Sequence, residues 1–424
     1  MKHPTAEHFA AFIGIDWAHA KHDICLQVEG SKALERSVLI HSPEAIDAWV
    51  RGLRERFGRR PIAIALELDK GPLVYALQKY EGFVLFPVNP TMLAKYRQAF
   101  TPSGAKDDPT DAELALQILL RHPEALKGLK PQSAPMRSLL QLVHDRRRLV
   151  NDKVRITNRL TNALKNYFPQ PLQWFRDKDT VLFCDFLSRW PTLKQLKRAR
   201  RSVLESFFHE HNVRRRAVIE ERINAIRSAL PLTEDPAILE PQALLVTALI
   251  AQLRCVLEAI ERFNSAIEAT TAQLPDYVIF SSLPGAGPTF APRLLAAFGE
   301  DRERYQRCEE LQKYSGIAPV TERSGQKSWV HWRYRAPTFL RQTFVEWAGE
   351  TIPRSFWAKA FYEQQRAKGL SHQAALRALA FKWIRIVYRC WQDRKPYDEA
   401  TYLNALKRHG SPLLSYASER SGHR

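Results

Sequence analysis

The chain has 424 residues, of which 45% are hydrophobic and 26% are charged, and its formal net charge is +19. This length allows two or three domains. The positive charge favours a polyanionic partner, most simply nucleic acid, with a merely solubilising surface as the alternative. Five scattered cysteines, without a Cys-x-x-Cys or Cys/His cluster, exclude a disulfide framework and a zinc finger. We find no signal peptide and no stretch near the roughly 20 apolar residues of a membrane span, so we expect a cytoplasmic protein without a membrane partner.

The first 130 residues predict a mixed α/β domain. Strands that first follow one another and then alternate with helices are typical of such a sheet. The apolar run at 61–68 has the composition of a buried central strand. In chain order we expect three short strands within 11–41, a helix capped by Ser42 and ending near Arg56, the strand at 61–68, a helix at 71–80, a strand at 83–88 and a helix from Thr91.

Residues 131–275 predict a helical arm. Apolar residues recur at steps of three, four or seven from Leu139 to Phe168, as on one face of a long amphipathic helix. Short basic helices at 172–235 and a second long helical pattern at 237–274 follow it. Two long helices that flank shorter ones favour an antiparallel coiled coil.

The basic residues concentrate in this arm. Residues 131–230 hold 21 Lys and Arg against nine Asp and Glu, a net charge of +12, whereas residues 1–130 carry +1 and residues 231–424 carry +6. A solubilising charge has no need to gather in one quarter of the chain, so we interpret the arm as a surface for nucleic-acid phosphates. The candidate contacts on the outer face of the first long helix are Arg146, Arg147, Arg148, Lys153, Arg155 and Arg159.

The rest of the chain predicts a mainly helical domain at 276–400 and a tail at 401–424 whose end frays. The expected fold class is therefore α/β plus all-α, with the α/β domain at 1–130.

Acidic side chains stand at the ends of two apolar strands. Asp16 ends the first strand, and Glu67 ends the strand at 61–68, with Asp69 on the same face two residues later. A charge in such a place needs solvent, a partner or a metal ion. Taken singly, each is an ordinary strand-end or turn residue.

Further acids open a later helix. Pro109 suits a first helical turn and makes Asp108 a candidate N-cap, and Asp108 and Asp111 share one helical face, with Asp107 adjacent. Alone, this is a capped helix with an acidic first turn. Together with the strand-end acids, it predicts convergence at the carboxyl edge of the sheet. Two carboxylates about 4 Å apart repel by roughly 4 kcal/mol at an effective dielectric of 20. We therefore expect cations among them, and oxygen-only ligands favour Mg²⁺ or Mn²⁺.

The segments GIDWAHAKHDICL, ALELDKGPLVYAL and FPVNPTMLAKYRQAFTPSGAKDDPTDAELA resemble the RuvC-like domain of the DEDD transposases, the insertion-sequence 110/1111 family. The resemblance implies an RNase H-like (RuvC-like) fold for residues 1–130. The family usually has Ala-Thr-Gly after its Glu, whereas in this chain the segment after Glu67 contains Asp69. Asp107 directly precedes Asp108. Asp69 and Asp107 are therefore further candidates for the site. The family's four catalytic, metal-binding acids map onto Asp16, Glu67, Asp108 and Asp111.

The C-terminal region extends the resemblance. In the family, a Gly-x-x-Pro segment leads to a Ser-Gly pair that carries the nucleophilic serine, and a Leu-Arg pair follows. The family usually has a Gly-Asn pair before this Leu-Arg pair, and this chain lacks it. Ser315-Gly316 has the same composition as the Ser-Gly pair, and only the family register favours Ser324 over Ser315. The matching elements are Gly316 to Pro319, Ser324-Gly325 and Leu340-Arg341.

Basic and aromatic residues surround Ser324 in the sequence. Trp329, Trp332 and Tyr334 interleave with basic side chains as on many nucleic-acid surfaces, with core packing as the alternative for at least one tryptophan. The basic side chains could neutralise a phosphate and its transition state. We expect nucleic-acid contacts from Arg323, Lys327, Arg333, Arg335 and Arg341.

The resemblance implies a transposase that cuts and rejoins DNA through a phosphoserine at Ser324, with Mg²⁺ (or Mn²⁺) held by the four acids. Such a link conserves phosphoester energy, which is consistent with the lack of a P-loop motif for ATP. The implied partners are donor DNA, target DNA, a structured guide RNA encoded by the element, and further copies of the chain in a homodimer or homotetramer. Two alternatives stay open: a metal-dependent junction resolvase that uses no serine, and a non-catalytic RNA-binding protein with degenerate acids.

Overall fold

In the computed structural model, the chain forms two compact units, residues 1–131 and residues 132–424. The structure describes residues 9–67, 71–100, 108–130, 132–334 and 336–413.

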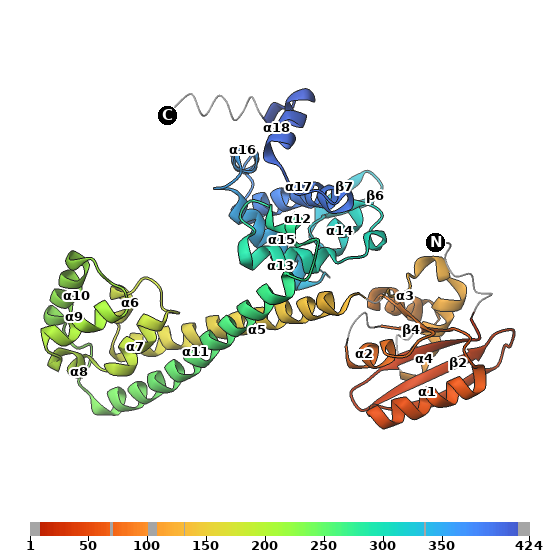
Figure 1. Cartoon of the computed structure of the whole chain (residues 1–424), viewed down its shortest axis with the longest axis horizontal. Coiled ribbons are helices and arrows are strands. Elements are labelled where there is room, and N and C mark those ends of the chain that lie inside the picture. The colour runs from red at the N-terminus through yellow and green to blue at the C-terminus, as the bar shows by residue number, and fades with distance from the viewer. Residues whose placement is uncertain (1–8, 68–70, 101–107, 131, 335, 414–424) are drawn as a thin grey trace. The chain divides into compact units, whose positions relative to one another are not determined.

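The first unit is built on a five-stranded mixed sheet (Figure 1). Its strands are β1 (Ala11–Trp17), β2 (Lys21–Val28), β3 (Leu34–Ile40), β4 (Ile62–Leu66) and β5 (Phe83–Pro87). β1, β2 and β3 pair antiparallel, whereas β4 runs parallel to β1 and β5 runs parallel to β4. The order across the sheet is β3-β2-β1-β4-β5, so β1 lies at the centre. The mixed α/β sheet expected for this region is confirmed.

Helices cover both faces of this sheet. They are α1 (Pro43–Phe57), α2 (Pro72–Gln78), α3 (Pro90–Phe100) and α4 (Asp108–Arg121), followed by the 3₁₀ turn η2 (Pro123–Ala125). Ser42 caps α1, as expected, because its hydroxyl accepts a hydrogen bond from the backbone N–H of Ala45. Alternate residues of β1 divide between the two faces. Ile13 and Ile15 pack in the core with α1 and α2, and Phe12 packs in the core with α3 and α4.

Two long helices, α5 (Ala134–Tyr167) and α11 (Pro236–Thr271), dominate the second unit. They lie side by side and run in opposite directions (Figure 1). The end of α5 and the start of α11 belong to one hydrophobic core, and the start of α5 and the end of α11 belong to a second. Side-chain caps begin both helices: Ser133 accepts from the N–H of Met136, and Asp235 accepts from that of Ala237. The two expected long helices form an antiparallel pair, and coiled-coil geometry stays a prediction.

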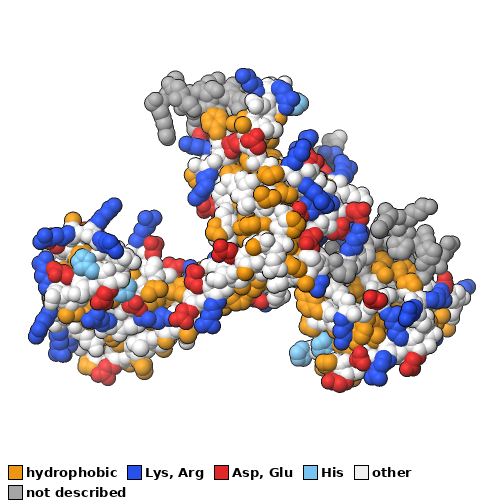
Figure 2. All heavy atoms as spheres, viewed as in Figure 1, with side chains coloured by type: hydrophobic (Ala, Val, Ile, Leu, Met, Phe, Trp, Pro, Cys, Tyr) orange, Lys and Arg blue, Asp and Glu red, His pale blue; other side chains and the backbone are white. Residues whose placement is uncertain are grey.

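A cluster of short helices surrounds one end of this pair. It consists of α6 (Pro171–Trp174), α7 (Val181–Arg189), α8 (Leu193–Arg198), α9 (Arg201–Glu210) and α10 (Arg216–Ser228). Aromatic side chains, among them Phe183, Phe186 and Phe207, fill its core against α5 and α11. Many Lys and Arg side chains lie on its surface (Figure 2).

The C-terminal helices surround the other end of the pair, and the first turns of α5 insert into their core. These helices are α12 (Tyr277–Ser281), α13 (Gly287–Phe298), the 3₁₀ turn η3 (Arg302–Arg304), α14 (Cys308–Tyr314), α15 (Thr338–Thr351), α16 (Phe356–Ala367), α17 (His372–Asp393) and α18 (Glu399–Arg408). Four fully buried tryptophans fill the core: Trp347, Trp357, Trp383 and Trp391. The mainly helical character expected of this region is confirmed.

A two-stranded antiparallel hairpin, β6 (Val320–Ser324) and β7 (Lys327–His331), interrupts these helices and was not expected. Gly325 adopts a φ of 56° in the two-residue turn, a conformation that glycine takes without a steric cost. Val320 and Thr321 precede this glycine, and Trp329 and Val330 follow it. This β-prone composition around a Gly turn is the signal that could have predicted the hairpin.

One helix, α11, qualifies the expectation that no stretch comes near the apolar length of a membrane span. An 18-residue window of this helix has a mean hydropathy of 1.9, and only 28% of the window is buried, so α11 is long and apolar enough to cross a membrane by length and composition alone. Core helices pass the same test, and α11 packs against α5 through Val246, Leu249 and Leu253. This composition is therefore weak evidence for a membrane span.

Two details differ from the sequence-based expectation. Val154 belongs to the apolar pattern expected between Leu139 and Phe168, yet it is 49% exposed, and Ile156 is buried instead. The tail predicted from residue 401 begins inside α18, whose Tyr402 and Leu406 pack against the C-terminal core. Residues 414–424, in which we expected fraying, lie outside the described residues.

Candidate active site

Asp16 and Glu67 lie at neighbouring strand ends. Parallel pairing places Ile15 of β1 beside Leu66 of β4, so Asp16, the next residue of β1, and Glu67, the residue after β4, leave the sheet at the same edge. By alternation along β1, Asp16 belongs to the face that α4 covers. Asp16 is 9% exposed, and Glu67 is half-buried.

Gly14 allows the first turn of α4 to lie close over β1. A Cβ atom at this position would lie 2.0 Å from the carbonyl oxygen of Ala112 and 2.6 Å from the backbone nitrogen of Leu116. Backbone atoms cannot move aside as a flexible side chain can, so this approach requires glycine. Asp111, the residue before Ala112, is thereby held on the same face of the sheet as Asp16.

Asp111 is almost fully buried, with 1% of its surface exposed, and it is paired with an arginine. The Nε and one terminal nitrogen of Arg97 in α3 each donate a hydrogen bond of 2.6 Å to a different oxygen of this carboxylate. Arg97 therefore neutralises the charge of Asp111 in this arrangement.

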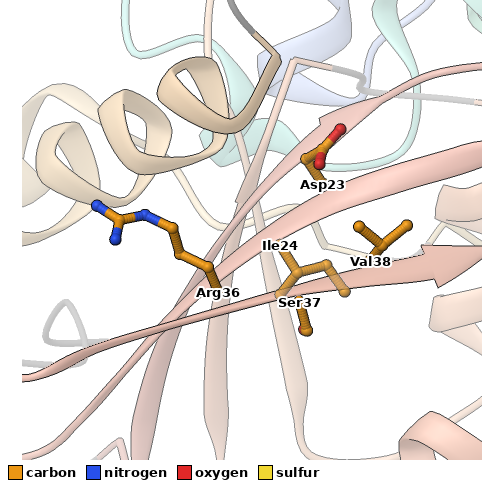
Figure 3. Close-up of a pocket in the computed structure, with 5 residues that line it drawn as sticks. All are labelled: Asp23, Ile24, Arg36, Ser37 and Val38. Atoms are coloured by element: carbon orange, nitrogen blue, oxygen red, sulfur yellow. The ribbon is translucent and has the colours of Figure 1, made fainter.

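Asp23 of β2 is a further acid at this edge that the sequence reasoning missed. The strand register pairs it with Asp16, so both side chains project from one face, and both are 9% exposed. Figure 3 shows Asp23 in a pocket that Arg36 of β3 also lines. Arg36 extends toward α4, where it pairs with Glu113 at 2.6 Å. The signal in the sequence is a charged residue inside the strand HDICLQV, where a tight turn sets it opposite Asp16.

His22 adds no positive charge to this edge near pH 7. The residue is fully buried, and its Nε2 lies 2.9 Å from Nδ1 of His41. Burial, together with the nearby His41, lowers the pKa of His22 to about 4. The ring stacks on Trp17.

The donor chemistry of this edge fits a hard divalent cation, because its acids offer only oxygen. Among the described residues, however, no three His, Cys, Asp or Glu side chains lie close enough together to hold one metal ion. Asp108 begins α4, but its side chain lies outside the described part of the chain, as do Asp69 and Asp107. A cation bound by Asp111 would have to share the carboxylate with Arg97 or displace Arg97 from it.

Ser324 and Ser315 differ in exposure and in bonding. Ser324 ends β6 at the tip of the hairpin, opposite Lys327, and is exposed. Ser315 follows α14 and is fully buried, and its hydroxyl donates a hydrogen bond of 3.3 Å to the carbonyl oxygen of Gln312. A phosphodiester in solvent can therefore reach Ser324 but not Ser315.

Two family models match the two regions that carry these residues. A transposase model of the IS110 DEDD type matches residues 13–169, and a model described as "Transposase IS116/IS110/IS902 family" matches residues 277–363. The first range contains the four candidate acids, and the second contains Ser324. The chain belongs to the IS110 family of transposases.

Relatives of similar length support this assignment. A mini-circle protein of IS117 from Streptomyces coelicolor, named as a transposase, is 28% identical over 414 residues, which cover 96% of this chain and 98% of the relative. The 44.8 kDa protein of insertion element IS116 from Streptomyces clavuligerus is 24% identical over 403 residues, 93% of this chain and 98% of its own. The 43.6 kDa protein of insertion element IS110 from Streptomyces coelicolor is 23% identical over 401 residues, 92% and 96% respectively. The resemblance found in the sequence is confirmed, and a transposase implies DNA as substrate.

Arg146 and Arg147 of this transposase do not lie on the outer face expected for them. Nε of Arg146 donates to Asn264 of α11 at 2.5 Å, and burial lowers the pKa of Arg146. Arg147 pairs with Glu346 of α15 at 2.8 Å. Both arginines therefore connect α5 to neighbouring helices. The periodicity of α5 could not reveal this, because their partners are far away in the sequence.

Three of the other arm residues of the transposase are exposed to solvent. Arg148 and Arg155 are exposed, and each pairs with an aspartate one turn earlier on α5. Lys153 pairs with Asp179 at 2.5 Å. Arg159 is exposed and makes no ion pair with any described residue.

Aromatic side chains around the hairpin of the transposase are open to solvent. Trp329 is 45% exposed, Trp332 is 38% exposed and Tyr334 is 77% exposed. Core packing therefore accounts for neither tryptophan. Arg323 and Lys327 are exposed on the hairpin itself.

The remaining basic residues expected near Ser324 lie beyond the hairpin. Arg333 and Arg341 are half-buried, and Arg335 lies outside the described residues. Arg377 of α17 contacts the ring face of Trp332. The sequence reasoning did not identify Arg377. Arg377 is 45 residues from Trp332 in the sequence, and no local pattern connects the two.

Proposed function

We propose that this transposase breaks and rejoins DNA through a covalent link between Ser324 and one DNA end. The observation that carries the proposal is the exposure of Ser324 at the hairpin tip, in contrast to the buried and hydrogen-bonded Ser315. Ser324 also stands in the nucleophile register of the family and within the segment that matches the family model.

The covalent step exchanges one phosphoester for another. Oγ of Ser324 forms a bond to phosphorus, and its proton passes to a nearby base or to water. The bond from phosphorus to one deoxyribose oxygen breaks, and that oxygen leaves as a hydroxyl. Attack by the hydroxyl of another DNA end reverses the step and rejoins the strand. The number of phosphoester bonds stays constant, so no ATP is needed.

We propose that Asp16, Glu67, Asp108 and Asp111 hold Mg²⁺ (or Mn²⁺) for this reaction. When bound, the ion supplies positive charge for the phosphate oxygens and for the attacking hydroxyl. Support comes from the shared sheet edge of Asp16 and Glu67 and from the close seating of α4, which carries the other two acids. The proposal requires Ser324 to reach this edge in the active assembly, within one chain or between two.

The wider proposal includes an RNase H-like fold for the first unit, a structured guide RNA and a homodimer or homotetramer acting in the cytoplasm. The strand order β3-β2-β1-β4-β5, with antiparallel β1 to β3, supports the fold. The basic surface of the short-helix cluster and the exposed Arg155 and Arg159 support phosphate contacts with RNA. Two DNA duplexes must be cut and exchanged, which favours an oligomer.

Trapping and mapping a protein–DNA adduct tests this function against the resolvase alternative. The purified transposase, with guide RNA, DNA and Mg²⁺, should give an adduct whose DNA remnant maps to Ser324 by mass spectrometry. Ser324→Ala should abolish the adduct and all rejoining, whereas the matched Ser315→Ala should keep both. Asp16→Asn and Glu67→Gln should abolish cutting and leave nucleic-acid affinity nearly unchanged.

Each other outcome of this experiment is decisive. Cleavage without any adduct favours a hydrolytic resolvase, and a remnant on another residue refutes the assignment of Ser324. Near-normal recombination by both acid variants refutes the metal site, and a lack of magnesium-dependent cleavage by the unmodified protein favours the non-catalytic alternative.

A further inference from the structure

Three arginines lie on separate elements that meet beyond the base of the hairpin. Arg333 follows β7, Arg341 lies in the first turn of α15, and Arg377 lies in the first half of α17. All three are half-buried, so their charges are neither fully solvated nor enclosed in a core.

Close packing at Gly316 brings two of these elements together. A Cβ atom on Gly316, whose φ is 72°, would lie 2.4 Å from Cβ of Ala336, 3.7 Å from the carbonyl oxygen of Arg333 and 3.8 Å from Cδ of Arg341. The chain after β7 and the start of α15 therefore meet over this glycine, and a larger residue would push them apart.

Arg377 completes the group from α17. Its guanidinium contacts the ring of Trp332, the residue before Arg333. Burial, together with the positive charge of the nearby Arg341, lowers the pKa of Arg377 to about 10. The fold thus holds like charges close to one another.

No acid compensates these charges among the residues that the structure describes. The side chains of Arg333, Arg341 and Arg377 make no hydrogen bond or ion pair with any described residue, and Nε of both Arg333 and Arg377 is buried without a partner. By contrast, Arg147 and Arg302 of the same unit are also half-buried, and each pairs with a carboxylate. Unpaired buried donors and like charges in one place both destabilise the protein unless an anion binds them.

We propose that Arg333, Arg341 and Arg377 form a binding site for a backbone phosphate of DNA, beside the exposed ring of Trp332. The identification of the anion as DNA rests on the proposed function. Planar guanidinium groups suit a phosphate, and an exposed aromatic ring beside them suits the adjacent sugar or base.

The bound phosphate is separate from the one that Ser324 attacks. Val320 pairs with His331 at the base of the hairpin, and Ser324 is four residues further along β6. At about 3.3 Å per strand residue, the tip is about 13 Å from the base. The arginines therefore hold a different phosphate of the same strand and help to align that strand for the reaction at Ser324.

DNA binding by the full-length protein tests the site. We would measure the affinity for a short fluorescent DNA duplex over a range of NaCl concentrations, together with the unfolding temperature. Arg377→Gln should weaken binding roughly tenfold or more and reduce the slope of log affinity against log salt by about one unit. Its unfolding temperature without DNA should stay equal or rise, because a repulsion is removed.

Two variants complete the design. Arg389→Gln is the matched control on the same helix, because Arg389 is exposed and pairs with Asp393 one turn away, and it should leave both readouts unchanged. The double variant Arg341→Gln/Arg377→Gln should reduce the slope by about two units. An unchanged slope for Arg377→Gln, or a lower unfolding temperature, means that Arg377 only packs against Trp332 and overturns the proposal. A loss of affinity for RNA of equal length but not for DNA also overturns it. DNA binding needs no cleavage, so the arginine variants should show the same salt dependence in a Ser324→Ala protein. The test of this site is therefore independent of the proposal that Ser324 is the nucleophile.

Discussion

Arg97 of α3 and Asp111 of α4 form a bidentate pair, in which two nitrogens of the guanidinium each donate a 2.6 Å hydrogen bond to a separate carboxylate oxygen. The side chain of Asp111 is 2% exposed and that of Arg97 is 16% exposed, so little water screens the pair. One of the four proposed metal ligands is therefore already satisfied by a cation of the protein itself.

Replacing Arg97 tests whether Asp111 is a metal ligand. Arg97→Ala leaves a buried carboxylate without its partner, which should lower the free energy of unfolding by about 3–5 kcal/mol. If Asp111 can bind a divalent ion, Mn²⁺ should raise the unfolding temperature of this variant more than that of the unmodified protein. Arg36→Ala is the control: Arg36 is the exposed partner of Glu113 in α4, and water screens such an ion pair, so its loss should change the stability little. An equal Mn²⁺ response of both proteins would exclude Asp111 as a ligand.

Gly14 should be indispensable for seating α4. In Gly14→Ala, the added methyl group would meet the backbone of Ala112 and Leu116, so urea denaturation should show a loss of about 1–3 kcal/mol or more. DNA cleavage should fall with it, because the first turn of α4 carries Asp111. Gly52→Ala in α1 has no atom within 4 Å of the new methyl group and should gain up to about 1 kcal/mol through helix propensity. A Gly14→Ala protein of normal stability would contradict the described packing.

The arm arginines should separate into structural and nucleic-acid-binding groups. Arg147→Gln should destabilise the protein by about 1–3 kcal/mol, because it leaves Glu346 with one arginine, Arg293, in place of two. It should not change the salt dependence of RNA binding. The double variant Arg155→Gln/Arg159→Gln should keep the stability and flatten the log-affinity against log-salt slope by up to about two units. An unchanged slope in the double variant would mean that this face of α5 is merely solvated.

His22 should make the stability of the first unit depend on pH between about 4 and 6.5. Its folded-state pKa is about 4, against an ordinary value of 6.5, so in this window the unfolded chain binds a proton that the folded chain does not. Stability should therefore fall as the pH drops from 6.5 to 4, by up to about 3 kcal/mol from this residue. His22→Gln should flatten this part of the profile of unfolding free energy against pH, and His19→Gln, at an exposed position, should not. Identical profiles for all three proteins would show that His22 titrates normally.

The sequence by itself predicted the features that depend on local chemistry. The strands of the first unit follow from short apolar runs, and the start of α1 follows from Ser42, because periodicity and capping involve only neighbouring residues. Asp16 and Glu67 could be identified because an acid that follows a run of apolar residues is visible in the sequence itself. The ordered motifs around Ser324 pointed to the family that the comparisons then confirmed.

Only the tertiary structure decided which side chains meet. The periodicity of α5 predicts that one face is buried but not which arginines find a partner, and Glu346 is 199 residues away from Arg147. Asp23 lies opposite Asp16 because of strand register, and Arg377 joins Arg341 because α15 and α17 pack together. Ser315 and Ser324 have the same local composition, yet Ser315 is buried directly after α14 and Ser324 is exposed at the end of β6. Burial and electrostatic environment are set by contacts distant in sequence, and no local pattern encodes them.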